Sequence, residues 1–252
     1  MELGERSVMD SNIPADRLSQ ISTMWTGLAR RDDVQADESR AAAAAFLDRY
    51  YQAVYGYLLR SVKDPDRAAE LFQEFALRFL KGDFRHADPG RGRFRDYLRT
   101  VLINLVRRSS SKPVNVALAA EPEVLPEEPV DGEFLTHWRE AILNVAWQAL
   151  QQEQNRGGPP YYSVLRLRAE KPDLTSVELA VQLTANLKAI EAYTDANVRK
   201  ILQRGREVFS DKVVDEVARS IPTRDEDRVA QELIDLGFLG FCRKALDRWR
   251  VQ

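Results

Sequence analysis

Apolar residues recur along most of the chain at the spacing of α-helices that bury one side. Between residues 94 and 105 they fall at positions i, i+3, i+4, i+7, i+8 and i+11, which is the period of a helix with one buried stripe. The pattern therefore predicts an all-α protein. The expected helices are 18–59, 68–82, 94–108, 134–157, 161–169, 176–183, 196–218 and a helical pair within 219–252.

Several of these helices have recognisable start signals. Asp64 followed by Pro65 provides a capping side chain and then a residue with a preset φ. Thr175 and Glu178 have the spacing of a capping box, and Thr194 or Asp195 is expected to cap the helix that follows. These signals divide the periodic stretches into separate helices.

The stretch 113–133 differs in composition from the helices around it. It contains Pro, Ala and six acidic residues but no Lys or Arg, and it has no periodic apolar face. Such a composition is typical of a solvated linker. The sequence therefore predicts two helical domains, 1–112 and 134–218, joined by this acidic linker and followed by an extension over 219–252.

Composition limits the classes of function. The chain has 252 residues, 44% of them apolar, and no run approaches the roughly 20 apolar residues of a membrane span. The N-terminus lacks the layout of a signal peptide. Two His and the single Cys242 are too few for a zinc site. A single Cys also cannot form an internal disulfide, which favours location in a reducing cytoplasm. Because Gly-rich phosphate loops and a serine elbow are also lacking, we expect no metal, no cofactor and no enzymatic activity.

The most basic stretch of the chain is 85–112. It carries eight Arg or Lys against two Asp, although the whole protein has a formal net charge of −2, so the excess marks a local surface. Arginines placed off the apolar stripe, next to a loop containing glycines, suit a phosphate backbone. The alternative is a solvated helix whose long cationic side chains cover its core. The candidate DNA-binding residues are Arg91, Arg93, Arg95, Arg99, Asn104, Arg107 and Arg108.

Residues 46–108 resemble the second conserved region of bacterial RNA polymerase sigma factors of the extracytoplasmic-function group. The resemblance implies that one face of the helix 68–82 contacts a coiled coil of the polymerase's largest subunit, and that 85–108 melts and reads the downstream promoter element around a flipped base. Tyr97 stands where the family more often has Trp, and the basic tail ends at Ser109. The polymerase-binding residues implied are Glu70, Gln73 and Glu74. The residues that carry the resemblance are Glu70, Leu71, Gln73, Glu74, Phe75, Phe94, Arg95, Tyr97, Leu98, Asn104, Arg107 and Arg108.

Residues 178–206 resemble the fourth conserved region of sigma factors, which reads the upstream promoter element. The segments 178–183 and 198–206 match a helix-turn-helix in which a short support helix holds a basic recognition helix over the major groove. Leu183 and Val198 are 15 positions apart, about twice the usual separation in the family, so the support helix or the turn must be longer here. The implied DNA-binding residues are Arg199, Lys200, Gln203, Arg204 and Arg206.

The order of these segments predicts a sigma-like transcription initiation factor that is not an enzyme. Its expected partners are core RNA polymerase and promoter DNA, both as duplex and as melted strand. The resemblance also allows an anti-sigma or other regulatory protein as a partner, and no membrane is expected. The alternative is a sigma-like adaptor or competitor that binds polymerase or a regulatory partner without initiating transcription. The short basic tail and the long insertion favour that alternative.

The extension 219–252 carries too many large apolar residues for a free tail, so it must bury them somewhere. In one interpretation its helical pair caps the core of the second domain. In the other, the pair packs between the two domains and masks a DNA-binding or polymerase-binding face until a signal releases it.

Overall fold

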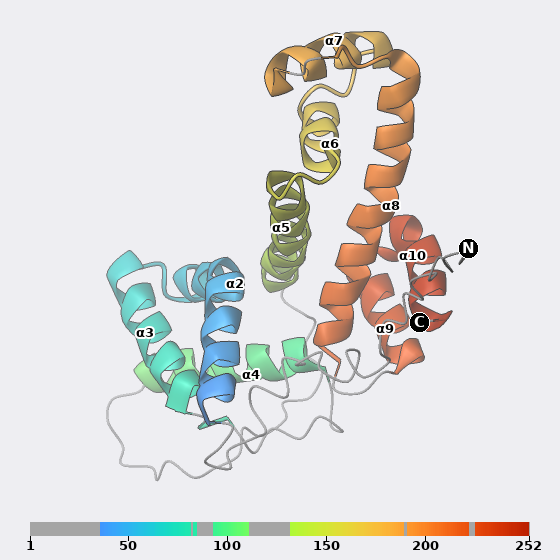
Figure 1. Cartoon of the computed structure of the whole chain (residues 1–252). Helices are drawn as coiled ribbons and strands as arrows, with labels where there is room; N and C mark the ends of the chain where they lie inside the picture. Colours follow the sequence, from blue (N-terminus) through green and yellow to red (C-terminus); the bar gives the residue numbers. More distant parts are fainter. Residues whose placement is uncertain are drawn as a thin grey trace, which may run out of the picture.

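Helices α2 (Ala36–Val62) and α3 (Pro65–Lys81) lie side by side, and α4 (Phe94–Ser110) crosses them (Figure 1). The computed structural model describes residues 36–81, 83–84, 93–110, 132–188, 191–221 and 225–251, with only the backbone for 36–42 and 133. Every regular element in these residues is an α-helix, which confirms the predicted class. The predicted helical stretch 18–35 and the linker residues 113–131 lie outside the described residues.

The start of α3 is as predicted. Asp64 Oδ1 accepts hydrogen bonds from the backbone N–H groups of Asp66 and Arg67, at 3.0 and 3.2 Å, and Pro65 is the first helical residue. Aromatic side chains of α2, α3 and α4 contact one another in the core. Phe46 of α2 stacks on Phe79 of α3 with 4.8 Å between ring centroids, and it meets Phe94 of α4 edge-on. Such pairs add to the energy of apolar burial.

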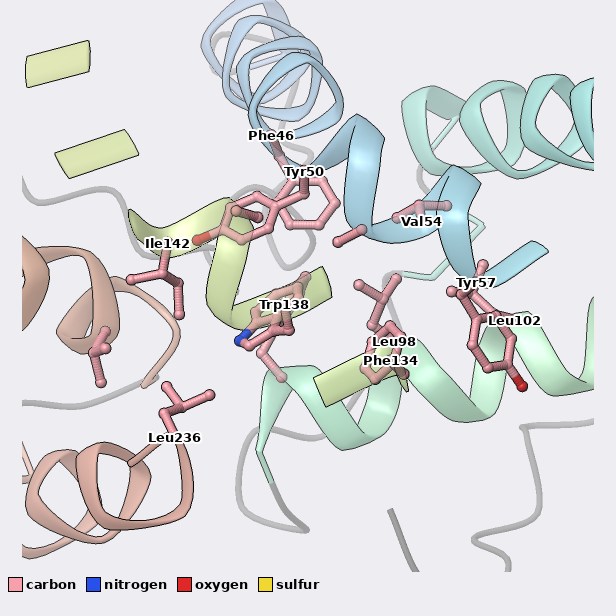
Figure 2. Packing of buried hydrophobic residues seen from close by; sticks show 14 of the residues in the cluster. Phe46, Tyr50, Val54, Tyr57, Leu98, Leu102, Phe134, Trp138, Ile142 and Leu236 are labelled. Atoms are coloured by element: carbon pink, nitrogen blue, oxygen red, sulfur yellow. The ribbon is translucent and has the colours of Figure 1, made fainter. Parts of the chain in front are cut away.

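Helix α5 (Gly132–Asn155) returns to the same core. Trp138 is fully buried and stacks on Tyr50, with ring centroids 4.5 Å apart (Figure 2). Gly56 of α2 permits this approach, because a Cβ built there would lie 3.0 Å from Nε2 of His137. The first turns of α5 therefore pack against α2, although the sequence assigns these helices to different domains.

A second, smaller core lies at the other end of α5. It is formed by α6 (Tyr161–Glu170), α7 (Ser176–Leu187) and the first half of α8 (Asp195–Arg219). Gly205 of α8 lies against α6, where an added Cβ would be 3.4 Å from side-chain atoms of Leu165 and Tyr161. The buried members of this smaller core are Leu150, Val164, Leu165, Leu167, Leu179, Ala180, Leu183, Val198 and Leu202.

The extension forms two helices, α9 (Glu226–Asp235) and α10 (Leu239–Val251), as the sequence predicts. They pack beside the lower half of α8 (Figure 1). Their apolar residues join the larger core with those of α2 to α5, and among the described residues none of them belongs to the smaller core. The larger core thus includes helices from both sides of the predicted linker. The buried residues that α9, α10 and their connection contribute are Val229, Leu233, Leu236, Phe238, Cys242, Ala245 and Leu246.

Candidate nucleic-acid interface

One face of α3 is exposed and acidic. Leu71, Phe75 and Phe79 bury the opposite side of the helix, so the residues between them point to solvent. Two of its acidic side chains form ion pairs along the helix surface, Glu70 with Arg67 at 2.8 Å and Glu74 with Arg78 at 3.6 Å. Leu77 lies on the same side, one helical turn beyond Glu74, and 58% of it is exposed. The three candidate polymerase-binding residues, Glu70, Gln73 and Glu74, are all exposed here.

The N-terminal turn of α4 differs from the expectation that its arginines lie off the buried stripe. Arg95 is only 2% exposed, because α9 covers the side of α4 that would otherwise face solvent. Arg95 Nη1 lies 3.2 Å from Glu232 Oε1 and Arg95 Nη2 lies 3.8 Å from Asp235 Oδ2. In this arrangement Arg95 is an internal ion-pair partner rather than an exposed phosphate ligand.

Arg93 belongs to the same cluster. It donates from Nη1 to Glu232 Oε2 at 3.2 Å and also to Asp235. The pKa of Glu232 is raised, chiefly by burial and also by the charges of Asp96 and Asp235, although Arg95 and Arg93 act to lower it. Burial also acts to raise the pKa of Asp235, but hydrogen bonds from Arg93 and Gln231, together with the charges of Arg93 and Arg95, lower it overall. Two arginines of the predicted DNA-binding segment are therefore occupied by two carboxylates of the extension. We name these four residues, Arg93, Arg95, Glu232 and Asp235, the α4–α9 ion cluster.

The rest of α4 fits its expected amphipathic pattern more closely. Leu98, Val101, Leu102 and Leu105 are buried, while Arg107 and Arg108 are exposed in the last turns. Asn104 and Arg99 are half-buried. Arg91 lies outside the described residues. The cations that this part of α4 presents to solvent therefore lie toward its C-terminal end.

Helices α7 and α8 begin as predicted. Thr175 and Glu178 form a capping box, with Thr175 Oγ1 accepting from the backbone N–H of Glu178 at 3.3 Å and Glu178 accepting from that of Thr175 at 2.8 Å. Thr194, rather than Asp195, caps α8 by accepting from the N–H of Asn197. Part of the inserted stretch extends α7 to Leu187.

The first half of α8 has a buried side and an exposed basic side. Of the residues predicted to be buried, Val198, Leu202 and Gly205 are buried, whereas Ile201, Val208 and Phe209 are half-buried. Two of the exposed arginines have acidic neighbours on the same helix, Arg199 with Asp195 at 2.7 Å and Arg204 with Glu207 at 2.8 Å. The candidate DNA-binding residues Arg199, Lys200, Gln203, Arg204 and Arg206 are all exposed along this helix.

Two buried glutamates were not singled out from the sequence. Glu216 of α8 is 1% exposed and accepts from Tyr50 Oη at 2.7 Å and from Arg49 Nη1 at 3.2 Å. Glu232 of α9 is likewise 1% exposed. Both occupy stripe positions, Glu216 among Val213, Val214 and Val217, and Glu232 among Val229, Leu233 and Leu236. An acid inside an apolar stripe was the available signal, because such a residue is rarely buried without a partner.

Part of the chain is similar to a known protein family. Residues 46–112 match the family model of Sigma-70 region 2, a range that runs from the middle of α2 through α3 and α4. Comparisons with curated proteins and with solved structures gave no match. The match supports a relationship of this segment to sigma-70 factors, and it includes the acidic face of α3 and the basic turns of α4.

The described residues also show no membrane-spanning helix and no metal site. Within them, no helix is long and apolar enough to cross a membrane. In the same parts of the chain, no three His, Cys, Asp or Glu side chains come together as a metal site. The buried Cys242 thiol has its pKa raised to about 12, chiefly by burial, so it is a neutral core side chain.

Proposed function

We propose that the protein is a sigma-like transcription initiation factor of the extracytoplasmic-function type. It binds core RNA polymerase, recognises promoter DNA through two basic helical surfaces and promotes strand opening, without enzymatic activity of its own. The observation that carries this proposal is the match of residues 46–112 to Sigma-70 region 2.

The polymerase contact is assigned to the exposed face of α3. Glu70, Gln73 and Glu74 point away from the larger core, so a partner can reach them without unfolding the helix. The exposed Leu77 beside them adds apolar area to a charged face, a combination that suits a protein partner better than solvent.

DNA contacts are assigned to two surfaces. The first is the basic part of α4, where Arg107 and Arg108 are exposed and Asn104 offers the donor and acceptor pair suited to a base edge. The second is α8, on which five polar or basic residues between 199 and 206 are exposed while α7 supports the buried side. The arrangement of α7 and α8 supports a helix-turn-helix that places α8 in the major groove.

Transcription with purified components tests this function. The chain is mixed with core RNA polymerase and genomic fragments, and run-off products are measured. Discrete transcripts that require the chain are expected. Co-purification with core polymerase without any transcript, on every fragment tested, would instead favour the second candidate function.

That second candidate is a sigma-like adaptor or competitor that binds polymerase or a regulatory partner without initiating transcription. The α4–α9 ion cluster favours it, because Arg93 and Arg95 are already paired within the chain. A protein whose downstream DNA-binding arginines stay occupied would hold polymerase without opening a promoter. Regulatory partners, including an anti-sigma protein, belong to either candidate.

A further inference from the structure

Helix α9 places two carboxylates where a nucleic-acid phosphate would bind. Arg93 and Arg95 flank the start of α4, and each of them lies within ion-pair distance of both Glu232 and Asp235. A carboxylate and a phosphate oxygen are recognised by the same forked guanidinium donors. The contacts of α9 with these arginines are therefore of the kind that a DNA backbone would make.

The charged contact between Arg95 and Glu232 is poorly satisfied. Although Arg95 Nη1 and Glu232 Oε1 are 3.2 Å apart, both atoms, and Arg95 Nε, are buried without a hydrogen bond of acceptable geometry. Burial of two charges is costly, and a buried pair adds stability only when the geometry is good and the remaining hydrogen-bonding groups are satisfied. The pair is therefore a weak source of stability.

The apolar residues of α9 are sufficient to explain why it packs on the core. Val229 and Leu233 of α9 and Leu236 at its C-cap are fully buried, whereas Glu232 places a carboxyl group in the same stripe. Asp96 lies near the same cluster and adds negative charge that opposes the ionised form of Glu232. The acidic residues of α9 thus add a specific contact with α4 that the packing of this helix does not require.

We propose that α9 is an autoinhibitory helix, in which Glu232 and Asp235 occupy Arg93 and Arg95, two candidate phosphate-binding residues at the start of α4. This inference rests on the proposed DNA-binding function of α4. A DNA strand and α9 then compete for the same two guanidinium groups. Because such coupling is reciprocal, whatever displaces α9 strengthens DNA binding, and DNA that engages α4 loosens α9.

Removal of the two charges tests the proposal with little change in side-chain shape. The double variant Glu232→Gln/Asp235→Asn leaves Arg93 and Arg95 without anionic partners on α9. The matched control is Asp227→Asn/Asp247→Asn, which removes the same charge from exposed positions on α9 and α10. Affinity for a labelled single-stranded oligodeoxynucleotide of mixed sequence is measured against salt concentration, with the full chain alone and with core polymerase.

The double variant is expected to bind this strand about tenfold more tightly than the wild type, within the usual range of intramolecular coupling. Two newly available arginines should also steepen the dependence of log affinity on log salt by about 1.4, at roughly 0.7 for each phosphate neutralised. The control variant should bind like the wild type. Equal affinity and slope in all three proteins would overturn the autoinhibitory role and leave DNA binding itself intact.

A second measurement needs no variant and decides the matter if the double variant folds poorly. Amide hydrogen exchange of residues 226–235 in the wild-type chain is followed with and without saturating oligodeoxynucleotide. Faster exchange in α9 on DNA binding is expected, and unchanged exchange would overturn the proposal. If no protein binds the strand, alone or with polymerase, the proposed function of α4 fails together with this inference.

Discussion

The hydroxyl group of Tyr50 donates a 2.7 Å hydrogen bond to Glu216, and both side chains are only 1% exposed. The bond joins α2, part of which lies in the segment similar to Sigma-70 region 2, to the second half of α8. Arg49 and Arg219 also bind the Glu216 carboxylate, at 3.2 and 2.9 Å. Burial, followed by the charge of Glu216, raises the pKa of Tyr50 well above its usual value, so the phenol stays a neutral donor.

Tyr50→Phe should lower the free energy of unfolding by about 1.5–3 kcal/mol, because it removes a hydrogen bond to a buried charged acceptor. Urea denaturation measures the change. Tyr51→Phe is the matched control, since Tyr51 is 37% exposed and stacks on Tyr55, and its effect should stay within about 0.5 kcal/mol. Similar losses in the two variants would show that the Glu216 contact carries no special stability.

Gln73→Ala/Glu74→Ala should weaken binding to core polymerase by about tenfold, equivalent to about 1.4 kcal/mol. Helicity should be unchanged, because both side chains are exposed and Ala favours the helix. Affinity is measured by titration with labelled core enzyme. Gln148→Ala/Glu140→Ala removes the same residue types from an exposed part of α5 and should leave binding intact. Equal affinities would remove α3 from the polymerase contact.

Asn104→Ala should lower discrimination between promoter and unrelated DNA, because a side-chain amide reads base edges. The salt dependence of binding should hardly change. Arg108→Ala is the comparison, since it should weaken binding to all sequences and reduce the salt slope by about 0.7 to 0.9. Competition titrations at several salt concentrations separate the two effects. A uniform loss from Asn104→Ala would contradict a reading role.

The raised pKa of Glu232 predicts a pH-dependent stability. Between the ordinary glutamate pKa and the raised one, the folded protein holds a proton on Glu232 that the unfolded chain has released. The contribution of this group to the free energy of unfolding therefore falls as pH rises through that window. Glu232→Gln does not titrate, so its free energy of unfolding should shift upward relative to the wild type as pH rises.

Urea titrations across a pH series measure this difference. Asp227→Asn, on an exposed position of the same helix, should follow the wild-type pH curve. A Glu232→Gln curve parallel to that of the wild type would mean that Glu232 titrates normally in the folded protein.

Helix positions and caps could be predicted because they depend on local residues. The apolar stripe from Phe94 to Leu105, the cap at Asp64 and the capping box at Thr175 are each encoded within a few positions, and the structure confirms them. The exposed face of α3 followed from the same periodicity. None of these features requires a partner distant in the sequence.

The partners of Arg95 and Tyr50 could not be predicted in the same way. Periodicity places Arg95 off the stripe of α4, but it does not show that α9 covers that turn, because Glu232 of α9 lies 139 residues from Arg93 along the chain. The position of Glu232 within an apolar stripe indicates that its carboxylate has a buried partner, but the sequence does not identify that partner. The core in which the extension 219–252 buries its apolar residues also depends on long-range packing. These residues lie in the larger core, with those of α2 and α4, rather than in the smaller core.

Helix α8 belongs to both cores, with Val198 and Leu202 in the smaller one and Val213, Val214 and Val217 in the larger one. An α-helix turns by about 100° and advances about 1.5 Å with each residue. The number of residues between Leu202 and Val213 therefore sets the rotational phase of the basic face of α8 relative to α2 and α4. One residue inserted between Phe209 and Val213 would put that face about 100° out of phase with α2 and α4, although the residues of α8 that pack on the smaller core, up to Phe209, would keep their spacing.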